Sequence, residues 1–390
     1  MTRALAFLAT VAAFHLVPAI GGAHTGDATI ALHLALTAWM LYFWHRAGDG
    51  CLSIGTTIML GVVARLLLIP VAPFTTHDVE RYLWDGAVLL AGIDPYLVAP
   101  DDAAVASLRE AWPTPAEHGA YATLYPPLAL GLFALSALAG PVGGLWLWKS
   151  LIALASIATL FVTAMFLRRI GHERHLALIA FSPLMLLEAG VGAHVDAFST
   201  LCLSAALLAV SARRWGWVGV AVGLGTAFKL LPLLMLGPLL ASLSWRRWSP
   251  VLTGTAAGLA IPYGAAMMAG LTPLGSLGVF FEKWRFGSPL YDLLAHLDGL
   301  VAIPLLAVLL TVLACWYARQ DLYMGLLGVL SVPLLLSPVV FPWYLLPLVP
   351  LLGVRPNLLT LVWLTLAPLS YEVLNAFNAT GEWSPAPWPL

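Results

Sequence analysis

The stretch TTHDVERYLWDGAVLLAGIDPYLVAPDD, residues 75–102, is the feature around which this 390-residue chain is organised. It is a long polar run between apolar segments, and it holds six acidic side chains, one Arg, two Tyr and one Trp. A membrane protein has no structural need to gather carboxylates and aromatic rings just beyond an apolar segment. We therefore interpret residues 75–102 as the acid-bearing wall of an active site on the outer face of a membrane.

The composition around this run defines the fold class. Hydrophobic residues make up 61% of the chain and charged residues 9%, whereas soluble domains average about 25% charged residues. A chain with so few charged residues must expose much of its surface to lipid. The sequence therefore predicts an all-α, polytopic transmembrane helical bundle of about 11–13 spans. The expected spans are residues 4–20, 28–45, 53–72, 145–167, 175–189, 196–212, 215–228, 230–244, 250–269, 299–318, 322–338, 342–354 and 357–372.

The basic residues predict the orientation of these spans. A cytoplasmic N-terminus places most arginines inside, provided that residues 126–140 form a helix that lies on the outer face without crossing. The chain then divides into N-terminal helices (1–72), an outer catalytic loop with short interfacial helices (73–144), central helices (145–269), a second outer loop (270–298), C-terminal helices (299–372) and an outer tail (373–390). We expect an integral membrane protein, of the bacterial inner or plasma membrane, with its active site outside.

Several classes of ligand have no support in the sequence. The net charge of −1 gives no nucleic-acid signal. Cys51, Cys202 and Cys315 lack the short spacing of a metal site and are interpreted as small buried hydrophobic residues. The short cytoplasmic connections contain no Gly-rich phosphate loop, which argues against chemistry driven by a nucleotide from that side. Nothing in the sequence predicts a partner subunit.

Asp78 and Glu80 open the polar run. Partial desolvation at a membrane surface would raise the basicity of such a carboxylate, so that it can take a proton from an attacking hydroxyl. The alternative is structural, because acidic residues also suit the first turn of a helix. Spacing alone leaves both interpretations open.

Four regions of the chain, taken in order, carry a resemblance to a known superfamily. HDVERYLWDG, AGIDPY and LYPPL lie in the first loop, and SPLMLLEAGVGAHVDAF (182–198), FKLLPLLMLGP (228–238) and SPVVFPWYLLPLVPLL (337–352) follow. They resemble the GT-C glycosyltransferases, in particular the catalytic subunits of GPI mannosyltransferase I and bacterial polyprenyl-phosphate-mannose-dependent mannosyltransferases. Those enzymes open the loop with an acidic pair, whereas the second acid here is Glu80 instead of Asp, and two extra helices precede the usual first span.

The resemblance implies a glycosyltransferase that moves a hexose, most often mannose, from a polyprenyl-phosphate donor to a glycan or glycolipid acceptor. Asp78 would be the base of an inverting displacement, and Glu80 would either orient the acceptor or help to hold a metal. Enzymes of this kind that use lipid-phosphate sugars often need no metal, so the resemblance implies no metal and no cofactor. His77, Arg81 and Tyr82, from the same motif, are then expected to bind substrate.

Other polar residues are expected on the same side of the membrane. Glu188, His194 and Asp196 lie at the mouth of two helices, where they form either a second wall of the site or helix ends in headgroup water. Lys229 needs an anion, which is either a lipid phosphate or a carboxylate such as Glu188 or Asp196. Arg65, in the third span, is expected to have a structural ion pair.

The remaining predicted substrate-binding residues are aromatic or cationic. Lys283 and Arg285 flank Trp284 in the second outer loop, where Arg can hold phosphate through paired donors. Tyr125, Trp343 and Tyr344 are expected to stack on sugar or lipid. An ordinary interfacial anchor is the alternative for each of them.

Two further functions compete with a transferase. A lipid-linked glycan flippase or transporter would place its charges near the bilayer midplane, whereas here they cluster at the outer boundary. A ligase would move a whole glycan or lipid from the carrier. A structural scaffold would not need so acidic a loop.

Overall fold

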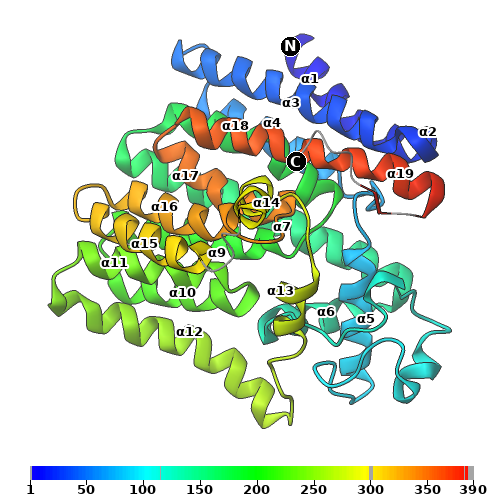
Figure 1. Cartoon of the computed structure of the whole chain (residues 1–390). Coiled ribbons are helices and arrows are strands. Elements are labelled where there is room, and N and C mark those ends of the chain that lie inside the picture. Colours follow the sequence, from blue (N-terminus) through cyan, green and yellow to red (C-terminus); the bar gives the residue numbers. More distant parts are fainter. Residues whose placement is uncertain (1, 115, 298–301, 382, 385–390) are drawn as a thin grey trace.

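The computed structural model describes residues 2–114, 116–297, 302–381 and 383–384, and within these ranges the chain is helical (Figure 1). The only extended pairing among the described residues is an isolated bridge between Phe286 and Val339. The helices from the first half of the chain are α1 (Thr2–Ala12), α2 (Val17–Ile20), α3 (Thr25–Gly48), α4 (Ile54–Leu67), α5 (Asp78–Leu90), α6 (Pro127–Ala137), α7 (Gly140–Ile170) and α8 (Leu176–Ala180). Those that follow are α9 (Asp196–Ser211), α10 (Trp215–Phe228), α11 (Leu236–Ser242), α12 (Trp248–Met268), α13 (Leu277–Lys283), α14 (Pro289–His296), α15 (Ala302–Tyr317), α16 (Leu322–Leu335), α17 (Val349–Val354), α18 (Leu358–Leu366) and α19 (Val373–Thr380).

The lengths of the apolar helices confirm an all-α polytopic membrane protein. Four helical stretches of the described chain are long and apolar enough to cross a membrane: Thr2–Ile20, Gly140–Ile170, Trp245–Met268 and Leu358–Thr380. A bent pair, Glu173–Ala180 with Met185–Val191, adds a fifth. Most of the other predicted spans are shorter apolar helices of 10–17 residues. The expected count of spans therefore stays a prediction, because helices of that length are shorter than the ~20 residues of a full crossing.

Some predicted spans are broken where the sequence contains Pro. The span expected over 175–189 is divided into α8 and a π-helix, Met185–Val191, bent by 47° at a break that includes Pro183. The span expected over 342–354 is a 3₁₀ segment, Pro342–Leu348, followed by α17. Proline cannot donate the helical hydrogen bond, and its ring clashes with the preceding turn. These breaks place backbone turns beside the polar residues described below.

The longest helix, α7, crosses the centre of the molecule. Its 31 residues correspond to roughly 46 Å, more than a ~30 Å hydrocarbon layer. Pro141 lies in its first turn, and Gly171, with a φ of 73°, caps its C-terminus in the left-handed conformation. α7 packs against α9, which packs against α10, and α10 packs against α12.

The two ends of the chain lie side by side. α3 contacts α18, α19 and the 3₁₀ segment Ala367–Glu372, as Figure 1 shows for the blue and red helices. The amide nitrogen of Gly26 donates to Asn375 at 2.8 Å, and a Cβ at Gly26 would lie 2.3 Å from the carbonyl oxygen of Tyr371. The tail predicted to begin at 373 thus starts as helix α19. Residues 382 and 385–390 of that tail, and residues 298–301 at another predicted boundary, lie outside the described residues.

The first loop folds around α5 and α6, which pack closely together. A Cβ at Gly86 would lie 2.4 Å from the backbone of Phe133, so only glycine permits this approach. Tyr96, in the AGIDPY motif, donates its hydroxyl to the carbonyl oxygen of Tyr125, in LYPPL, at 2.8 Å. A helix is present where one was predicted over 126–140, and that it lies on the outer face without crossing stays a prediction.

Candidate active site

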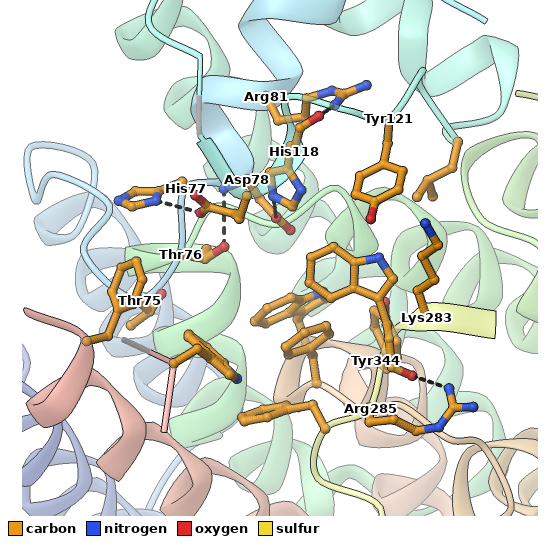
Figure 2. Close-up of a pocket in the computed structure, with 18 of the residues that line it drawn as sticks. Thr75, Thr76, His77, Asp78, Arg81, His118, Tyr121, Lys283, Arg285 and Tyr344 are labelled. Atoms are coloured by element: carbon orange, nitrogen blue, oxygen red, sulfur yellow. Dashed lines mark hydrogen bonds and ion pairs between the residues drawn. The ribbon is translucent and has the colours of Figure 1, made fainter. Parts of the chain in front are cut away.

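A cavity of about 420 Å³ opens where α5 begins (Figure 2). Its walls come from both halves of the chain, and they are polar on the side of α5 and aromatic around the segment from Phe341 to Tyr344 and along α19. The lining residues are Phe74, Thr75, Thr76, His77, Asp78, Arg81, Glu117, His118, Tyr121, Ala122, Leu124, Tyr125, Lys229, Ser276, Lys283, Trp284, Arg285, Phe286, Phe341, Trp343, Tyr344, Tyr371, Leu374, Phe377, Asn378 and Trp383. Figure 2 shows Asp78 and His118 across this space from Lys283 and Arg285.

Asp78 is the first residue of α5, and its carboxylate reaches the cavity with 13% of the side chain exposed. Its amide nitrogen donates to the hydroxyl of Thr76 at 3.1 Å, which helps to fix the helix start. The hydroxyl of Tyr82 donates to Oδ2 at 3.2 Å. His118 Nε2 lies 3.9 Å from Oδ1 on the other side. The carboxylate is therefore held in place but remains open to a ligand.

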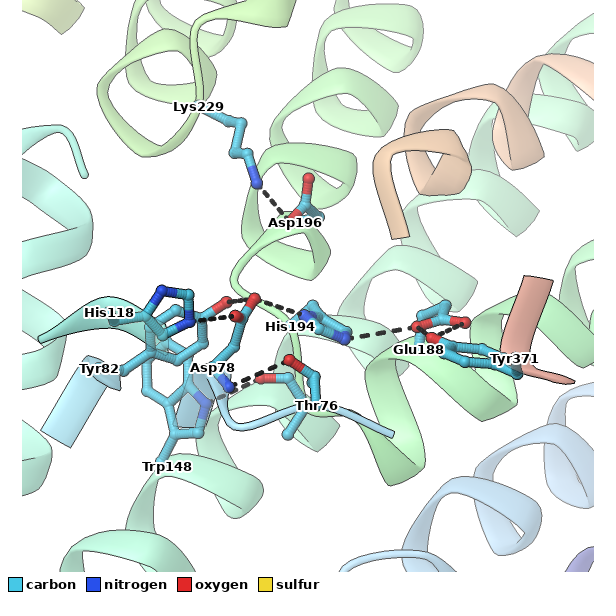
Figure 3. Close-up of polar contacts among 11 residues, drawn as sticks. Thr76, Asp78, Tyr82, His118, Trp148, Glu188, His194, Asp196, Lys229 and Tyr371 are labelled. Atoms are coloured by element: carbon cyan, nitrogen blue, oxygen red, sulfur yellow. Dashed lines mark hydrogen bonds and ion pairs between the residues drawn. The ribbon is translucent and has the colours of Figure 1, made fainter. Parts of the chain in front are cut away.

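Behind Asp78 runs a buried chain of polar side chains (Figure 3). His194 Nδ1 lies 3.3 Å from Asp78 Oδ2, and His194 Nε2 lies 3.4 Å from Glu188 Oε2, although neither contact has the angles of a hydrogen bond. The hydroxyl of Tyr371 donates to both Glu188 oxygens at 2.9 and 3.0 Å. Glu188 and His194 are 0% exposed. The imidazole of His194 therefore lies between two carboxylates, with one ring nitrogen facing each of them.

His194 is held from several sides. Its ring stacks on Trp343 at 3.8 Å with an interplanar angle of 11°. The preceding Ala193 has a φ of 52°, a left-handed conformation that is rare outside glycine, and its carbonyl oxygen accepts from Trp148 Nε1 at 2.8 Å. Backbone strain of this kind persists only where surrounding contacts impose it. The strained turn thus aims the imidazole at Asp78.

Lys149 joins the two segments that meet at the site. This buried ammonium, from α7, donates to the carbonyl oxygens of Val71 and Gly190 at 2.6 Å each and approaches that of Val191 at 3.3 Å. Val71 precedes Asp78 along the chain, and Gly190 follows Glu188. Lys149 therefore fixes the two sequence segments relative to each other.

Charge around Asp78 keeps it ionised. Burial raises the pKa of the Asp78 carboxyl, but the contact with His194, together with the charge of Lys229, outweighs burial and brings the pKa below its usual value. The sequence-based expectation that desolvation raises its basicity is therefore wrong. Burial does raise the pKa, as expected, but the sequence did not reveal that His194 would lie against the carboxylate.

Lys229 follows α10 and lines the cavity. Its Nζ donates to Asp196 Oδ2 at 2.9 Å and lies 4.6 Å from the ring centre of Tyr344. The sequence left a lipid phosphate and a carboxylate as possible partners of Lys229. In the structure the partner is a carboxylate, that of Asp196, the first residue of α9. Asp196 itself does not line the cavity.

Arg81 and Asp85 form a buried ion pair one turn into α5. Arg81 Nε donates to Asp85 Oδ1 at 2.8 Å, and Arg81 Nη1 donates to the carbonyl oxygen of His118 at 3.0 Å. Burial raises the pKa of Asp85. Arg81 borders the cavity, but its guanidinium is engaged by these groups, so its geometry suits positioning of His118 better than binding of substrate.

His77 and Glu117 pair at the rim of the cavity. His77 Nδ1 lies 2.7 Å from Glu117 Oε1, and both side chains are more than one-third exposed. The hydrogen bond to Glu117 raises the pKa of His77 despite some burial. Burial raises the pKa of Glu117, but the bond to His77 outweighs it and lowers the pKa overall. The pair thus links the start of α5 to the loop at residues 116–118.

This pair predicts a pH-dependent loop. Because the pKa of His77 is raised, its stabilisation of the loop is complete below about pH 6.5 and is lost as the pH rises through the pKa of the folded state. Because the pKa of Glu117 is lowered, its stabilisation is complete above about pH 4.5 and is lost on acidification. We expect amides of residues 117–121 to be more protected from hydrogen exchange at pH 5.5 than at pH 8, after correction for intrinsic rates. Glu117→Gln should remove the difference, and an unchanged difference would contradict the assignment. The exposed pair is worth less than about 1 kcal/mol.

The other predicted residues divide into two groups. Tyr125, Lys283, Arg285, Trp343 and Tyr344 line the cavity. Glu80 does not: it is exposed, and it forms no ion pair with another side chain among the described residues.

Sequence reasoning missed several residues that the fold brings to the cavity. His118 and Tyr121 come from the loop after α5, and Tyr371 and Phe377 come from the C-terminal helices. The only signal for His118 and Tyr121 was the presence of His and aromatic residues in the first loop, which many loops share, and the sequence around Tyr371 and Phe377 gave no signal for the site. Within the described ranges, no three His, Cys, Asp or Glu side chains are placed to hold a metal ion.

Arg65 has partners that differ from those expected. Its guanidinium donates to Ser156 and to the carbonyl oxygens of Gly61, Ile179 and Ala180, at 2.8–3.1 Å. No carboxylate pairs with it among the described residues, so the expected ion pair is wrong. The carbonyls at the C-terminus of α8 supply the negative end of a helix dipole instead.

Comparison with known families identifies the chain. Residues 9–245, more than half of its length, match the family described as alpha-(1->6)-mannopyranosyltransferase, N-terminal domain. The match contains Asp78, His194 and Lys229. A comparison with curated proteins found no match. The chain therefore belongs to the alpha-(1->6)-mannopyranosyltransferase family, and it is a membrane glycosyltransferase of the GT-C type that acts on mannose.

Proposed function

We propose that the protein transfers mannose from a polyprenyl-phosphate donor to a hydroxyl of a glycan or glycolipid acceptor on the outer face of the membrane. The observation that carries this proposal is the cavity itself, in which an ionised Asp78 lies across from Lys283 and Arg285. An acceptor hydroxyl needs a carboxylate, whereas a phosphate leaving group needs cations. Both requirements are met within one space.

The cationic side suits the donor phosphate. Lys229, Lys283 and Arg285 line the cavity, and Lys283 Nζ lies 5.6 Å from the ring centre of Tyr121. Negative charge develops on the phosphate as its bond to the sugar breaks, and preorganised cations stabilise that charge more in the transition state than in the bound donor. Lys229 is already paired with Asp196, and Lys283 and Arg285 are the other lysine and arginine on this side of the cavity.

The apolar side suits the isoprenoid tail. Phe74, Leu374 and Phe377 line the cavity on the side of α19. α14 lies beyond the cationic segment, and Leu293 within it (58%) and Leu297 just after it (70%) are exposed, in keeping with an interfacial position. The donor would then lie with its tail toward α19 and its phosphate toward Lys283.

The reaction is a single displacement at the anomeric carbon. The acceptor oxygen forms the new bond to that carbon, the bond to the phosphate oxygen breaks, and the polyprenyl phosphate leaves with the electron pair. The acceptor proton passes to Asp78. Because the pKa of Asp78 is below its usual value, this transfer belongs late in the reaction, when bond formation has made the acceptor proton acidic.

Displacement of this kind inverts the anomeric centre. The family is named for an alpha product, so inversion requires a donor in which mannose is joined to phosphate in the beta configuration. We therefore propose a beta-linked mannosyl phosphate as donor and an α-1,6 linkage as product.

The test is a transfer assay with purified protein. Beta-linked polyprenyl-phosphate mannose, its alpha-linked isomer and nucleotide-activated mannose are each incubated with mannose-containing glycolipids, and products are measured by mass and linkage. We expect the acceptor to gain one hexose from the beta-linked donor only. Gain of a whole glycan would favour a ligase. Movement of the intact donor across vesicles without transfer would favour a flippase, and use of the nucleotide donor would overturn the proposed donor.

Lys283 provides a prediction about the donor. Lys283→Met should raise KM for the donor about 10-fold to 100-fold, since a hydrogen bond to a charged group contributes about 1.5–3 kcal/mol. The variant should fold normally because the side chain is exposed. Lys283→Arg, which keeps the charge, serves as the matched control. An unchanged KM in Lys283→Met would remove this residue from the phosphate site.

A further inference from the structure

A second large cavity lies between α7, α9 and α10, away from the catalytic carboxylate. It is a groove of about 870 Å³ on the surface of the bundle. Its walls are apolar and in places small, with Val162, Ala205, Leu208 and Ala221 among the lining residues. In a membrane protein, a groove of this composition accommodates hydrocarbon chains.

Three arginines gather at one end of this groove. Arg168 and Arg169 form the last turn of α7, and Arg214 precedes α10. In the described part of the chain, none of the three forms an ion pair with a carboxylate. Three neighbouring guanidinium groups repel one another, and an anion between them would remove that cost.

Arg246 and Arg247, two other arginines of this region, contact aromatic rings instead. Arg247 lies 5.5 Å from the ring centre of Trp215, and Arg246 lies 5.6 Å from that of Trp245. Neither arginine lines the groove. The charge at the groove is therefore a local feature of Arg168, Arg169 and Arg214, and the pair Arg246 and Arg247 offers a matched comparison.

The arginines lie at the opposite end of the helices from the active site. α9 begins at Asp196 and runs for 16 residues, or about 24 Å, before the turn that contains Arg214. α10 returns from that turn to Lys229. The other end of the groove is lined by Leu201, Cys202 and Leu224. An occupant with its charge at the arginines is therefore distinct from the donor, whose phosphate belongs near Lys283.

We propose that the groove binds an anionic phospholipid, with an acyl chain along α9 and α10 and the phosphate held by Arg168, Arg169 and Arg214. Basic pockets between transmembrane helices on the cytoplasmic side commonly hold anionic lipid headgroups. Trp217, which lines the groove and is 64% exposed, suits the membrane interface. The lipid occupies the leaflet opposite the active site and does not take part in mannose transfer.

The test measures lipid binding by native mass spectrometry of the delipidated full-length protein. Phosphatidylglycerol and phosphatidylcholine with identical acyl chains are titrated into wild type, into R168Q/R169Q/R214Q and into the control R246Q/R247Q. We expect wild type and control to prefer phosphatidylglycerol. The triple variant should bind it about 100-fold more weakly, since each arginine near an anionic lipid contributes about fivefold.

Two further experiments test whether the groove binds a whole lipid and not a free phosphate or any apolar molecule. Ala205→Phe fills the groove and should weaken phosphatidylglycerol binding without altering the arginines. Glycerol phosphate, which has the headgroup chemistry but no tail, should not compete at concentrations that match the lipid. The proposal is overturned if wild type shows no preference for the anionic lipid, if the control loses as much binding as the triple variant, or if glycerol phosphate competes as well as the lipid.

Discussion

Asp78→Asn is expected to lower kcat for mannose transfer by roughly 10²-fold to 10⁴-fold, the usual contribution of a general base. Asparagine has the same shape but cannot accept the proton, so the acceptor hydroxyl would attack without help. Asp78 is largely buried yet reaches the cavity. Donor KM should change little. The thermal stability should fall, because a carboxylate with a lowered pKa stabilises the fold near neutral pH. The rate, KM and melting temperature are therefore measured in the same detergent preparation, at a temperature at which both proteins are folded.

Glu80→Gln is the matched control for Asp78→Asn. Glu80 lies two residues further along α5 and carries the same charge, but it is exposed and outside the cavity. The geometry predicts near wild-type activity for this variant, in contrast to the role that the resemblance implied. Equal losses in the two variants would show that charge at the helix start matters, and would contradict a specific role for Asp78.

Lys229→Met is expected to lower both the stability of the protein and the rate of mannose transfer. It leaves the carboxylate of Asp196, 3% exposed, without its partner, and breaking a buried pair by removing one member costs about 3–5 kcal/mol. Partial exposure of Lys229 places the loss at the lower end of that range. If Lys229 also stabilises the leaving phosphate, kcat falls by a further 10²-fold to 10³-fold, roughly the effect of losing one preorganised donor.

The double variant K229M/D196N separates the two effects. Removing both charges leaves no unpaired ion, so thermal stability should return close to that of wild type. Transfer activity should stay low, because the cation beside the phosphate is still absent. Recovery of activity along with stability would show that Lys229 is a structural partner of Asp196 alone.

The sequence predicted those parts of the site that depend on local order. The acidic residues that begin the polar run also suit the first turn of a helix, one of the two interpretations that the spacing left open, and α5 begins at Asp78. Lys229, three residues before Pro232, was correctly expected to need an anion. Such features follow from neighbours in the chain, because helix starts and buried charges have local signatures.

Contacts between distant segments could not be predicted in this way. Tyr371 reaches Glu188 across 183 positions of sequence, and Lys149 reaches Val71 across 78. Tyr371 also lies outside the residues that match the family. Whether an imidazole faces a carboxylate depends on how broken helices pack together. The contact between His194 and Asp78 is of this kind, and it reverses the expected direction of the pKa shift of Asp78.

The most direct test of the central claim is a structure of the protein with beta-linked polyprenyl-phosphate mannose bound. We expect the phosphate against Lys283 and Arg285, the tail along Phe74 and Phe377, and the open face of the anomeric carbon toward Asp78, with room for one acceptor hydroxyl between them. A donor bound with its sugar turned away from Asp78, or outside this cavity, would contradict the account.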